Sequence, residues 1–264
     1  MSLEGNGHKY GNYHDYYSFH PSDVRTSLLP PNIFQDLHDN DNDNDDTKIF
    51  NVLDIGCNEG NLTIDMYNRI RSELSNDITI HVIGIDIDEM LIDRANKKEK
   101  IVCSNSNNSN DTIQFITIDI MNNDSISIIS NRKFHFISIF SVTMWIHLNH
   151  GDDGLRNFLY NTIDLLTNKG SLLIEPQPWK CYKKAAKRLR KLGMPNPSFY
   201  GKLNINDIEK QITQMMMKND KNNSDINDKL FTSYNSYGPD PNWGRTLIMF
   251  HKDITIRKRK HEQE

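Results

Sequence analysis

The stretch Asp54-Ile-Gly-Cys-Asn-Glu-Gly60 follows a short apolar run, Lys48–Asp54, and precedes a segment with helical apolar spacing, Asn61–Arg71. A glycine turn between a strand and a helix brings backbone N–H groups close to a ligand, because only small residues permit that approach. The spacing G-x-x-x-G differs from the dinucleotide pattern G-x-G-x-x-G, since Asn58 stands where a middle glycine is expected. On spacing alone, glycines required only for packing are an equally good interpretation.

Apolar and β-branched runs alternate with helical patterns along the rest of the chain. The predicted helices are Glu89–Lys98 and Asp153–Leu166, and Gly170 precedes the fifth strand. The further predicted strands are Ile78–Ile85, Ile113–Ile118, Lys133–Phe140 and Ser171–Glu175, with two last strands at Phe231–Tyr237 and Thr246–His251. Strands that alternate with helices indicate an α/β fold, with a parallel sheet and helices on both of its faces.

Polar side chains stand at the ends of the predicted strands, where α/β sheets bind their ligands. Asp86, at the end of the second strand, can accept both ribose hydroxyls of an adenosine, whereas Asp88 suits the N-cap of the next helix. Asp119 can accept from an adenine amino group or serve as a turn residue. The full set of strand ends is Asp54, Asp86, Asp119, Ser141 and Glu175.

The chemistry of the glycine turn separates two nucleoside cofactors. A pyrophosphate requires a helix N-terminus closely lined by glycine, whereas the methionine part of S-adenosylmethionine requires polar groups for its carboxylate and ammonium. Asn58 and Glu59 favour S-adenosylmethionine, and Asp54 is available near its sulfonium. An oxidoreductase that uses a nicotinamide cofactor is disfavoured by the glycine spacing.

Three further motifs carry a resemblance to a known family. They are YGNYHDYYSFHP at 10–21, SVTMWIHLNHGDDGL at 141–155 and EPQPWKCY at 175–182. With them the chain resembles the bicoid-interacting type of RNA phosphate methyltransferases, above all the RNA 5′-monophosphate methyltransferases, which are relatives of the methylphosphate capping enzyme of small nuclear RNA. The resemblance spans about Tyr10 to Gly193 and is faint beyond. It implies a Rossmann-like class I methyltransferase with a seven-stranded, mostly parallel sheet.

The resemblance also implies an activity and a cofactor site. The substrate is expected to be the 5′-monophosphate of small RNAs, of the pre-microRNA or histidine tRNA class. The N-terminal segment is expected to fold over the cofactor. The capping enzyme has lysine where this chain has Met144, so we interpret the methionine as a preference for a less charged monophosphate end. The predicted cofactor-binding residues are Arg25, Asp54, Gly56, Asn58, Gly60, Asp86, Asp119, Ile120 and Met144.

A terminal phosphate has a second pKa of about 6, so methyl transfer to it needs cations and hydrogen-bond donors rather than a strong base. The predicted catalytic residues are Tyr17, His147 and Lys180. His147 alternatively fits a buried histidine with satisfied hydrogen bonds. With His150 it could share a metal, but no third ligand is evident, so we expect none. The predicted substrate-binding residues are His20, His150, Gln177, Lys184, Lys187, Arg188 and Arg245.

The segment Lys180–Lys191 is basic along its whole length. As a helix it has an apolar face of Ala185, Ala186, Leu189 and Leu192, and an outward face of Lys183, Lys184, Lys187, Arg188 and Lys191. An RNA backbone along this outward face would bring its 5′ end to the cofactor. A solvated helix face, or an amphipathic helix for a membrane or calmodulin, is the alternative.

Tracts of biased composition indicate how the chain is divided into segments and a domain. The 264 residues carry a net charge of −4, but Asp- and Asn-rich tracts supply much of the acid, and the three cysteines form no disulfide framework. We expect a covering segment at 1–30, a methyltransferase domain at 47–256 with disordered insertions near 39–46, 104–112 and 219–228, and a basic tail at 257–264 that aids RNA binding or nuclear import. We expect a monomer without a membrane span, in the cytoplasm, with the nucleus as the alternative. A non-catalytic RNA-binding module and a small-molecule methyltransferase are the alternatives.

Overall fold

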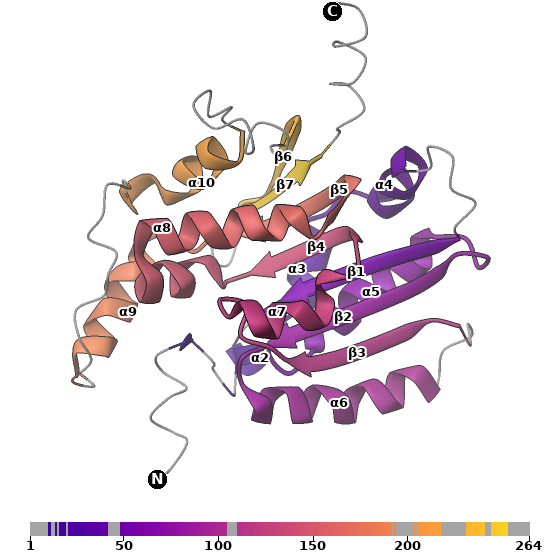
Figure 1. Cartoon of the computed structure of the whole chain (residues 1–264), viewed down its shortest axis with the longest axis horizontal. Coiled ribbons are helices and arrows are strands. Elements are labelled where there is room, and N and C mark those ends of the chain that lie inside the picture. Colours follow the sequence, from indigo (N-terminus) through magenta and orange to yellow (C-terminus); the bar gives the residue numbers. More distant parts are fainter. Residues whose placement is uncertain are drawn as a thin grey trace, which may run out of the picture.

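The computed structural model describes residues 10–11, 14, 16–19, 21–41, 48–104, 110–191, 193, 203, 205–217, 231–240 and 244–252. They form a seven-stranded sheet with the order β3-β2-β1-β4-β5-β7-β6 (Figure 1). Neighbours from β3 to β5 pair in parallel, and β7 is antiparallel to both β5 and β6. The strands are β1 (Ile49–Ile55), β2 (Thr79–Asp86), β3 (Thr112–Thr117), β4 (Phe134–Phe140), β5 (Leu166–Glu175), β6 (Ser233–Tyr237) and β7 (Leu247–His251). The predicted fold class is confirmed.

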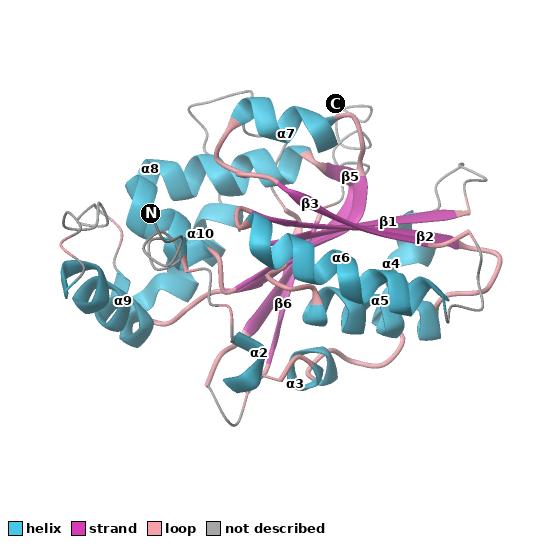
Figure 2. Ribbon diagram, turned by 90° about the horizontal axis from the view of Figure 1, so that it is seen from below, coloured by secondary structure: helices cyan, strands magenta, loops and turns pink. Residues whose placement is uncertain are grey.

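Helices cover both faces of the sheet, which lies edge-on between them in Figure 2. One apolar cluster joins one face to α4 (Ile33–Asp41), α5 (Asn61–Glu73) and α6 (Glu89–Ser104). A second cluster joins the other face to α7 (Asn123–Ser130), α8 (Thr143–Asp164), α9 (Trp179–Lys191) and α10 (Ile208–Met217). The central parallel strands β1, β2, β4 and β5 therefore bury residues on both of their sides, whereas the edge strands β3 and β6 keep exposed residues. Two short helices, α2 (Tyr16–Phe19) and α3 (Asp23–Ser27), precede α4.

The predicted boundary between α8 and β5 is wrong. Leu166 does not belong to the helix but begins β5 and pairs with Phe134, and a register shift separates this pair from the pairing of Phe136 with Ser171. Gly170 therefore lies inside the strand, not before it. The polar residues 167–169 interrupt the apolar pattern at this irregularity, which hid the start of the strand from the sequence.

Helix α8 begins ten residues before its predicted start at Asp153. Its first part buries Met144, Trp145 and Leu148, and the helix is broken at Gly151, which has φ of 69° and ψ of −170°. The prediction found only the part after the break, because the apolar spacing changes phase there. The helices α4, α7 and α10 were also missed, since each is at most ten residues long and its polar turns resemble loops.

Several predicted features lie outside the described residues. These are most of the acidic tracts at 39–46, 104–112 and 219–228, the basic tail at 257–264, and His20. In the part of the chain that the structure describes, no helix has the length and apolar character needed to cross a membrane.

Candidate functional site

A cavity of about 1410 Å³ opens at the carboxyl ends of strands β1 to β5. It brings together most of the predicted site residues, which lie on elements from both halves of the chain. Those that line it are Tyr17, Arg25, Asp54, Gly56, Asn58, Asp86, Asp119, Ile120, Met144, His150, Gln177, Lys180, Lys184, Arg188 and Arg245. Gly60, His147 and Lys187 do not line it. The sheet edge expected from the sequence is therefore the edge that carries the cavity.

The glycine turn lies against the end of β2. The N–H groups of Gly56 and Cys57 both donate to the carbonyl of Ile85, at 2.8 and 2.9 Å. Gly56 has φ of 78°, and a Cβ there would lie 2.2 Å from the Val142 side chain. A side chain at this position would therefore push against the cavity wall. Gly60, with φ of 81°, instead allows the turn to pack on the ring of Phe115 and is the N-cap residue of α5.

Asp86 is held in place by backbone N–H groups. Its Oδ2 accepts from Asn58 N at 2.9 Å, and its Oδ1 accepts from Asp88 N at 3.0 Å. Burial raises the pKa of Asp86 to about 6, against the effect of these hydrogen bonds. Asp88 accepts from the N–H of Met90 and so caps α6, as predicted. The carboxylate of Asp86 thus faces the cavity in a fixed orientation that suits a pair of ribose hydroxyls.

The other two carboxylates of this side have structural bonds as well. Asp54 accepts hydroxyl hydrogen bonds from Thr63 at 2.6 Å and Ser138 at 2.7 Å, one on each oxygen. Burial raises the pKa of Asp54, and these hydrogen bonds oppose the shift. Asp119 accepts from Met121 N at 2.9 Å, which is the turn role that the sequence left open beside adenine binding. Asp54 ties the turn to β4, and Asp119 shapes the loop that lines the cavity.

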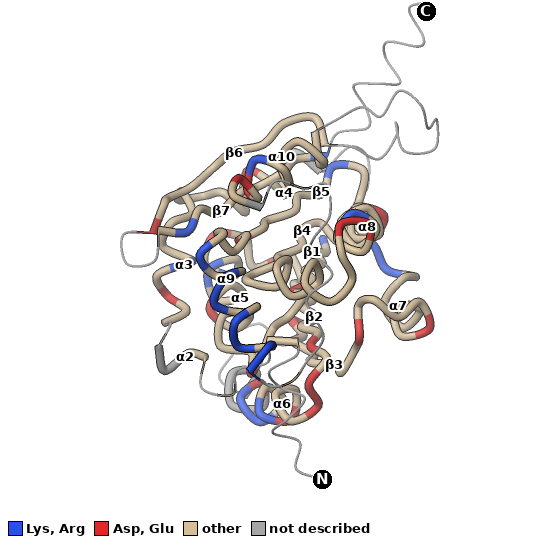
Figure 3. Tube along the Cα trace, turned by 90° about the vertical axis from the view of Figure 1, so that its left-hand side faces the viewer, with Lys and Arg blue, Asp and Glu red and all other residues tan. Residues whose placement is uncertain are grey.

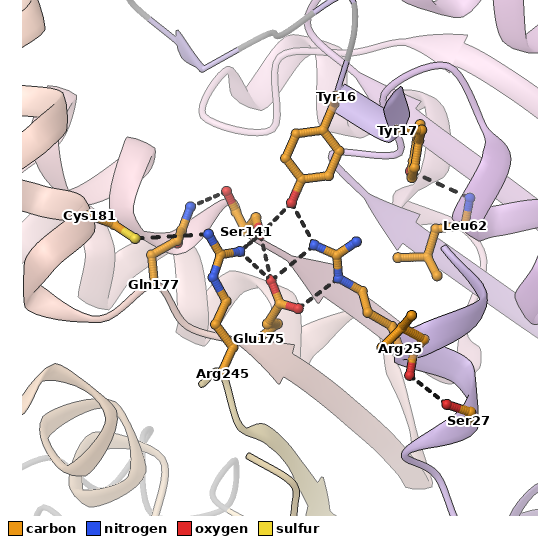
Figure 4. Close-up of polar contacts among 11 residues, drawn as sticks. Tyr16, Tyr17, Arg25, Ser27, Leu62, Ser141, Glu175, Gln177, Cys181 and Arg245 are labelled. Carbon is orange, nitrogen blue, oxygen red and sulfur yellow. Dashed lines mark hydrogen bonds and ion pairs between the residues drawn. The ribbon is translucent and has the colours of Figure 1, made fainter. Parts of the chain in front are cut away.

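A buried cluster of ions closes the opposite side (Figure 4). Glu175, at the end of β5, lies 2.7 Å from Arg25 Nε and 2.6 Å from Arg245 Nη1. Arg25 also donates to Tyr16 Oη at 2.6 Å, and Ser141 Oγ donates to Glu175 at 2.5 Å. Burial favours a raised pKa for Glu175, but the two guanidinium charges outweigh it and hold the pKa below its usual value. The cluster carries two cations for one anion, so it favours a negative ligand.

The N-terminal residues that the structure describes lie over the cavity. His14 Nε2 is 3.1 Å from Asp88 Oδ2, and Gly11 sits so close to the Trp145 indole that a Cβ would approach it to 2.1 Å. The N–H of Leu62 points at Tyr17 Oη, 3.4 Å away. Burial, and then the charge of Asp54, raise the pKa of Tyr17 well above its usual value. Tyr17 therefore stays protonated and can donate a hydrogen bond.

Gln177 supports the start of α8. Its Oε1 accepts from the N–H of Met144 at 3.1 Å and from the Thr143 hydroxyl at 3.3 Å. Its side-chain amide donates to the carbonyl of Ser141, a residue with φ of 61°. Gln177 therefore fixes the loop after β4, and it places Met144 in the cavity wall.

Helix α9 forms the basic rim of the cavity. Lys180, Lys184 and Arg188 follow one another at four-residue spacing and line it, whereas Lys187 is exposed and does not. The predicted inner face is confirmed for the residues described, since Ala185, Ala186 and Leu189 are buried. In Figure 3, Lys and Arg recur along the whole of α9, a distribution that we call the basic band of α9.

His147 lies behind the cavity wall and not in it. It is fully buried, with Nδ1 3.1 Å from Tyr182 Oη and Nε2 2.8 Å from Asp152 Oδ1. This arrangement gives no support to the predicted catalytic role and agrees with the alternative of a satisfied buried histidine. Among the described residues, no group of three or more His, Cys, Asp or Glu side chains is placed to share a metal ion.

The sequence did not identify the hydrogen-bonding role of Tyr16, nor the role of Glu175 as a bridge between two arginines. The position of Glu175 at the end of a strand was a usable signal, because Ser141 and Glu175 end neighbouring strands. Their partners were not visible, since Arg25 and Glu175 are 150 positions apart. A buried carboxylate at this edge requires cations, and that requirement points to Arg25 and Arg245.

Comparisons with known proteins find a matching family model and several curated relatives. A family model described as Bicoid-interacting protein 3 (Bin3) matches residues 134–252. The pre-miRNA 5′-monophosphate methyltransferase of Xenopus laevis is 39% identical, over 78% of this chain and 82% of its own length. The human RNA 5′-monophosphate methyltransferase is 34% identical, over 94% and 82%. The U6 snRNA methylphosphate capping enzyme Amus of Drosophila melanogaster is 30% identical, over 68% and 56%.

Two solved structures share the fold at low sequence identity. The CurJ carbon methyltransferase superposes with a TM-score of 0.54 at 14% identity, over 91% of this chain and 57% of its own. The plantazolicin methyltransferase BpumL, in complex with a desmethyl analogue and SAH, superposes with a TM-score of 0.51 at 13% identity, over 90% and 88%. The class I methyltransferase architecture is thus shared well beyond the range of close sequence similarity.

Proposed function

The chain belongs to the bicoid-interacting protein 3 (Bin3) family, and from this and the site geometry we propose that it methylates the 5′-monophosphate of small RNAs with S-adenosylmethionine. The single observation that carries the proposal is the arrangement of one cavity with two unlike sides. Asp86 and the glycine turn lie on one side, and Arg245, Lys180 and Lys184 lie on the other.

S-adenosylmethionine fits the carboxylate side of the cavity. The fixed carboxylate of Asp86 can accept hydrogen bonds from the ribose hydroxyls. Gly56 keeps the backbone of the turn accessible to the ligand, at a position where a Cβ would collide with Val142. Asn58, with φ of 53°, turns the chain so that the polar groups of the loop line the cavity. When bound, the cofactor supplies an electrophilic methyl group on a sulfonium. The residues of this side bind and orient it.

A terminal RNA phosphate fits the cationic side. With a second pKa of about 6, its oxygens are already anionic nucleophiles at neutral pH, so no general base is required. Tyr17 agrees with this, because burial keeps its hydroxyl protonated, so that it can donate a hydrogen bond and does not act as a base. Lys180 and Arg245 supply charge, and the covering residues Tyr16 and Tyr17 limit the access of water. Orientation is then the main contribution of the protein to the rate.

We also propose a class of RNA substrate, a cellular compartment and an oligomeric state. Small RNAs of the pre-microRNA or histidine tRNA class have an exposed 5′-monophosphate, and the name of the Xenopus relative supports the first of these. We place the reaction in the cytoplasm and propose that the protein acts as a monomer. The basic band of α9 supports RNA as the substrate, since a small molecule would not require it.

Phosphatase protection tests the proposal directly. RNA with a labelled 5′-monophosphate is incubated with the protein and S-adenosylmethionine and is then treated with phosphatase. Methylation converts the 5′-phosphomonoester into a diester, which phosphatase does not cleave, so retention of label that depends on both protein and cofactor is expected. RNA without a 5′-phosphate, assayed with tritiated cofactor, is the matched control and should accept no methyl group. Loss of all label despite measurable cofactor and RNA binding would instead identify a non-catalytic RNA-binding module.

A further inference from the structure

A buried hydrogen-bonded unit joins four segments of the chain behind the cavity. His147 precedes the break of α8 at Gly151, and Asp152 follows it. The histidine is 2.8 Å from Asp152 Oδ1 and 3.1 Å from Tyr182 Oη on α9. Asp152 Oδ2 also accepts the N–H of Leu203 at 3.1 Å. The three side chains thus hold both parts of α8, the middle of α9 and residue 203 together.

The protons of this unit follow from its acceptors. A carboxylate only accepts, so Nε2 of His147 carries the hydrogen that bonds to Asp152. Nδ1 is then the acceptor for the hydroxyl of Tyr182. Burial lowers the pKa of His147, against the opposing effect of Asp152, so the imidazole stays neutral at pH 7. Burial also raises the pKa of Tyr182, which keeps its hydroxyl protonated. Every donor in the chain of bonds therefore has its acceptor.

The position of Tyr182 on α9 determines which way the helix faces. Tyr182 lies two residues after Lys180 and two before Lys184, so its side chain leaves the helix about 200° away from theirs. The tyrosine is fully buried, and its ring meets that of His147 edge-on, with centroids 5.6 Å apart. A bond that fixes the buried side of the helix therefore also fixes the direction of the side chains on the opposite side.

We propose that His147, Asp152 and Tyr182 are positioning residues that set the rotation of α9 and so present Lys180, Lys184 and Arg188 to the cavity. None of the three touches the reacting atoms, because all three lie outside the cavity lining. The expected effect on RNA binding rests on the proposed function, whereas the expected effect on the orientation of α9 does not. Since a misplaced cation loses contact with the group that it binds, a hydrogen bond far from the chemistry affects substrate binding.

The test breaks the bond between His147 and Tyr182 from each side. Tyr182→Phe keeps the ring and removes the hydroxyl, and His147→Gln keeps an amide donor for Asp152 near the Nε2 position and leaves no acceptor at the Nδ1 position. Each variant is expected to raise KM for 5′-monophosphate RNA about threefold to tenfold, as for one lost buried hydrogen bond, with kcat and the Kd of S-adenosylhomocysteine within twofold of wild type. Because both remove the same bond, the double variant should be no worse than the more affected single one.

Hydrogen exchange separates this inference from the proposed function. Amides of α9 should exchange faster in both variants, and those of α5 should not change. Tyr67→Phe is the matched control: Tyr67 is a buried tyrosine of α5 whose hydroxyl donates to Asp111 at 3.0 Å, and its loss should leave α9 and the RNA KM unaltered. Unchanged exchange of α9 in Tyr182→Phe overturns the inference, whatever the activity. If wild type fails to methylate RNA while α9 responds as expected, the proposed function fails and the positioning unit stands.

Discussion

The two sides of the cavity are built in different ways. On the carboxylate side, Asp86 is oriented by backbone N–H groups of Asn58 and Asp88, within one strand, turn and helix unit and its neighbour. On the cationic side, Glu175 is held by Arg25 and Arg245, which come from the N-terminal helix α3 and from the residues before β7. The first side depends on local backbone geometry, and the second depends on contacts between distant parts of the chain.

The difference has a physical origin. A neutral nucleoside is recognised by a few fixed acceptors, which a strand end and a glycine turn provide. A phosphate needs several cations near one point, and these repel one another unless an anion lies between them. Glu175 is that anion. Substitutions on the cationic side are therefore expected to change the stability of the protein. Substitutions on the carboxylate side are expected to change chiefly the affinity for the ligand.

Glu175→Gln, on the cationic side, should have the largest effect, which is a loss of stability. It leaves the buried guanidinium of Arg25 and the largely buried guanidinium of Arg245 without their shared carboxylate, so the free energy of unfolding should fall by about 3 to 5 kcal/mol. Denaturant unfolding followed by circular dichroism measures this. Asp207→Asn, which removes an exposed ion pair to Lys210, is the control and should cost less than about 1 kcal/mol. Equal losses in the two variants would show that the cluster does not hold the distant segments together.

Asp86→Asn, on the carboxylate side, should weaken the binding of the cofactor without unfolding the protein. Loss of charged hydrogen bonds to a ribose predicts about a tenfold to hundredfold weaker Kd for S-adenosylmethionine at pH 8, measured by calorimetry. Because burial raises the pKa of Asp86 to about 6, the affinity of wild type should fall as the pH drops below 6, when the free carboxyl becomes protonated. The variant should show no such fall. RNA affinity should be the same in both, and a matching loss of RNA binding would contradict the separation of the two sides.

The basic rim tests how far the cationic side extends along α9. Replacing Lys184, Lys187 and Arg188 with Gln together should weaken RNA binding roughly tenfold and reduce the slope of log K against log salt by about 2 to 3. Cofactor affinity should not change. Replacement of Lys97, Lys133 and Lys210 with Gln removes the same charge from three exposed sites on other parts of the surface. If this control lowers RNA affinity equally, net charge matters and the helix does not.

The sequence predicted the carboxylate side better than the cationic side, for the same reason that separates them physically. Aspartates at strand ends and a glycine turn are local patterns, so Asn58, Asp86 and Asp88 were found, each with a suitable contact in the structure. The long-range contacts of Glu175 leave no periodic signal, and so its bond to Arg25 was missed.

The same limit explains the position of His147. Its motif placed it near the site, but its environment is made by Tyr182 and Asp152, on another helix and beyond a helix break. A histidine beside a strand end has the same appearance in sequence whether it faces a cavity or the core. The start of β5 was hidden in a comparable way, because the pairing of Leu166 with Phe134 lies beyond a register shift.

Met144→Lys should have the smallest effect, which is a change in the preference between triphosphate and monophosphate RNA. Met144 lines the cavity and has only 4% of its surface exposed, so a lysine there places a further cation beside the phosphate site. A triphosphate end carries more charge than a monophosphate and gains more from that cation, so the ratio of kcat/KM for triphosphate over monophosphate RNA should rise several-fold. Met144→Leu keeps the side chain apolar and should leave the ratio unchanged. An unaltered ratio in the lysine variant means that the arginines of the cluster, and not residue 144, set how many phosphates the cationic side accepts.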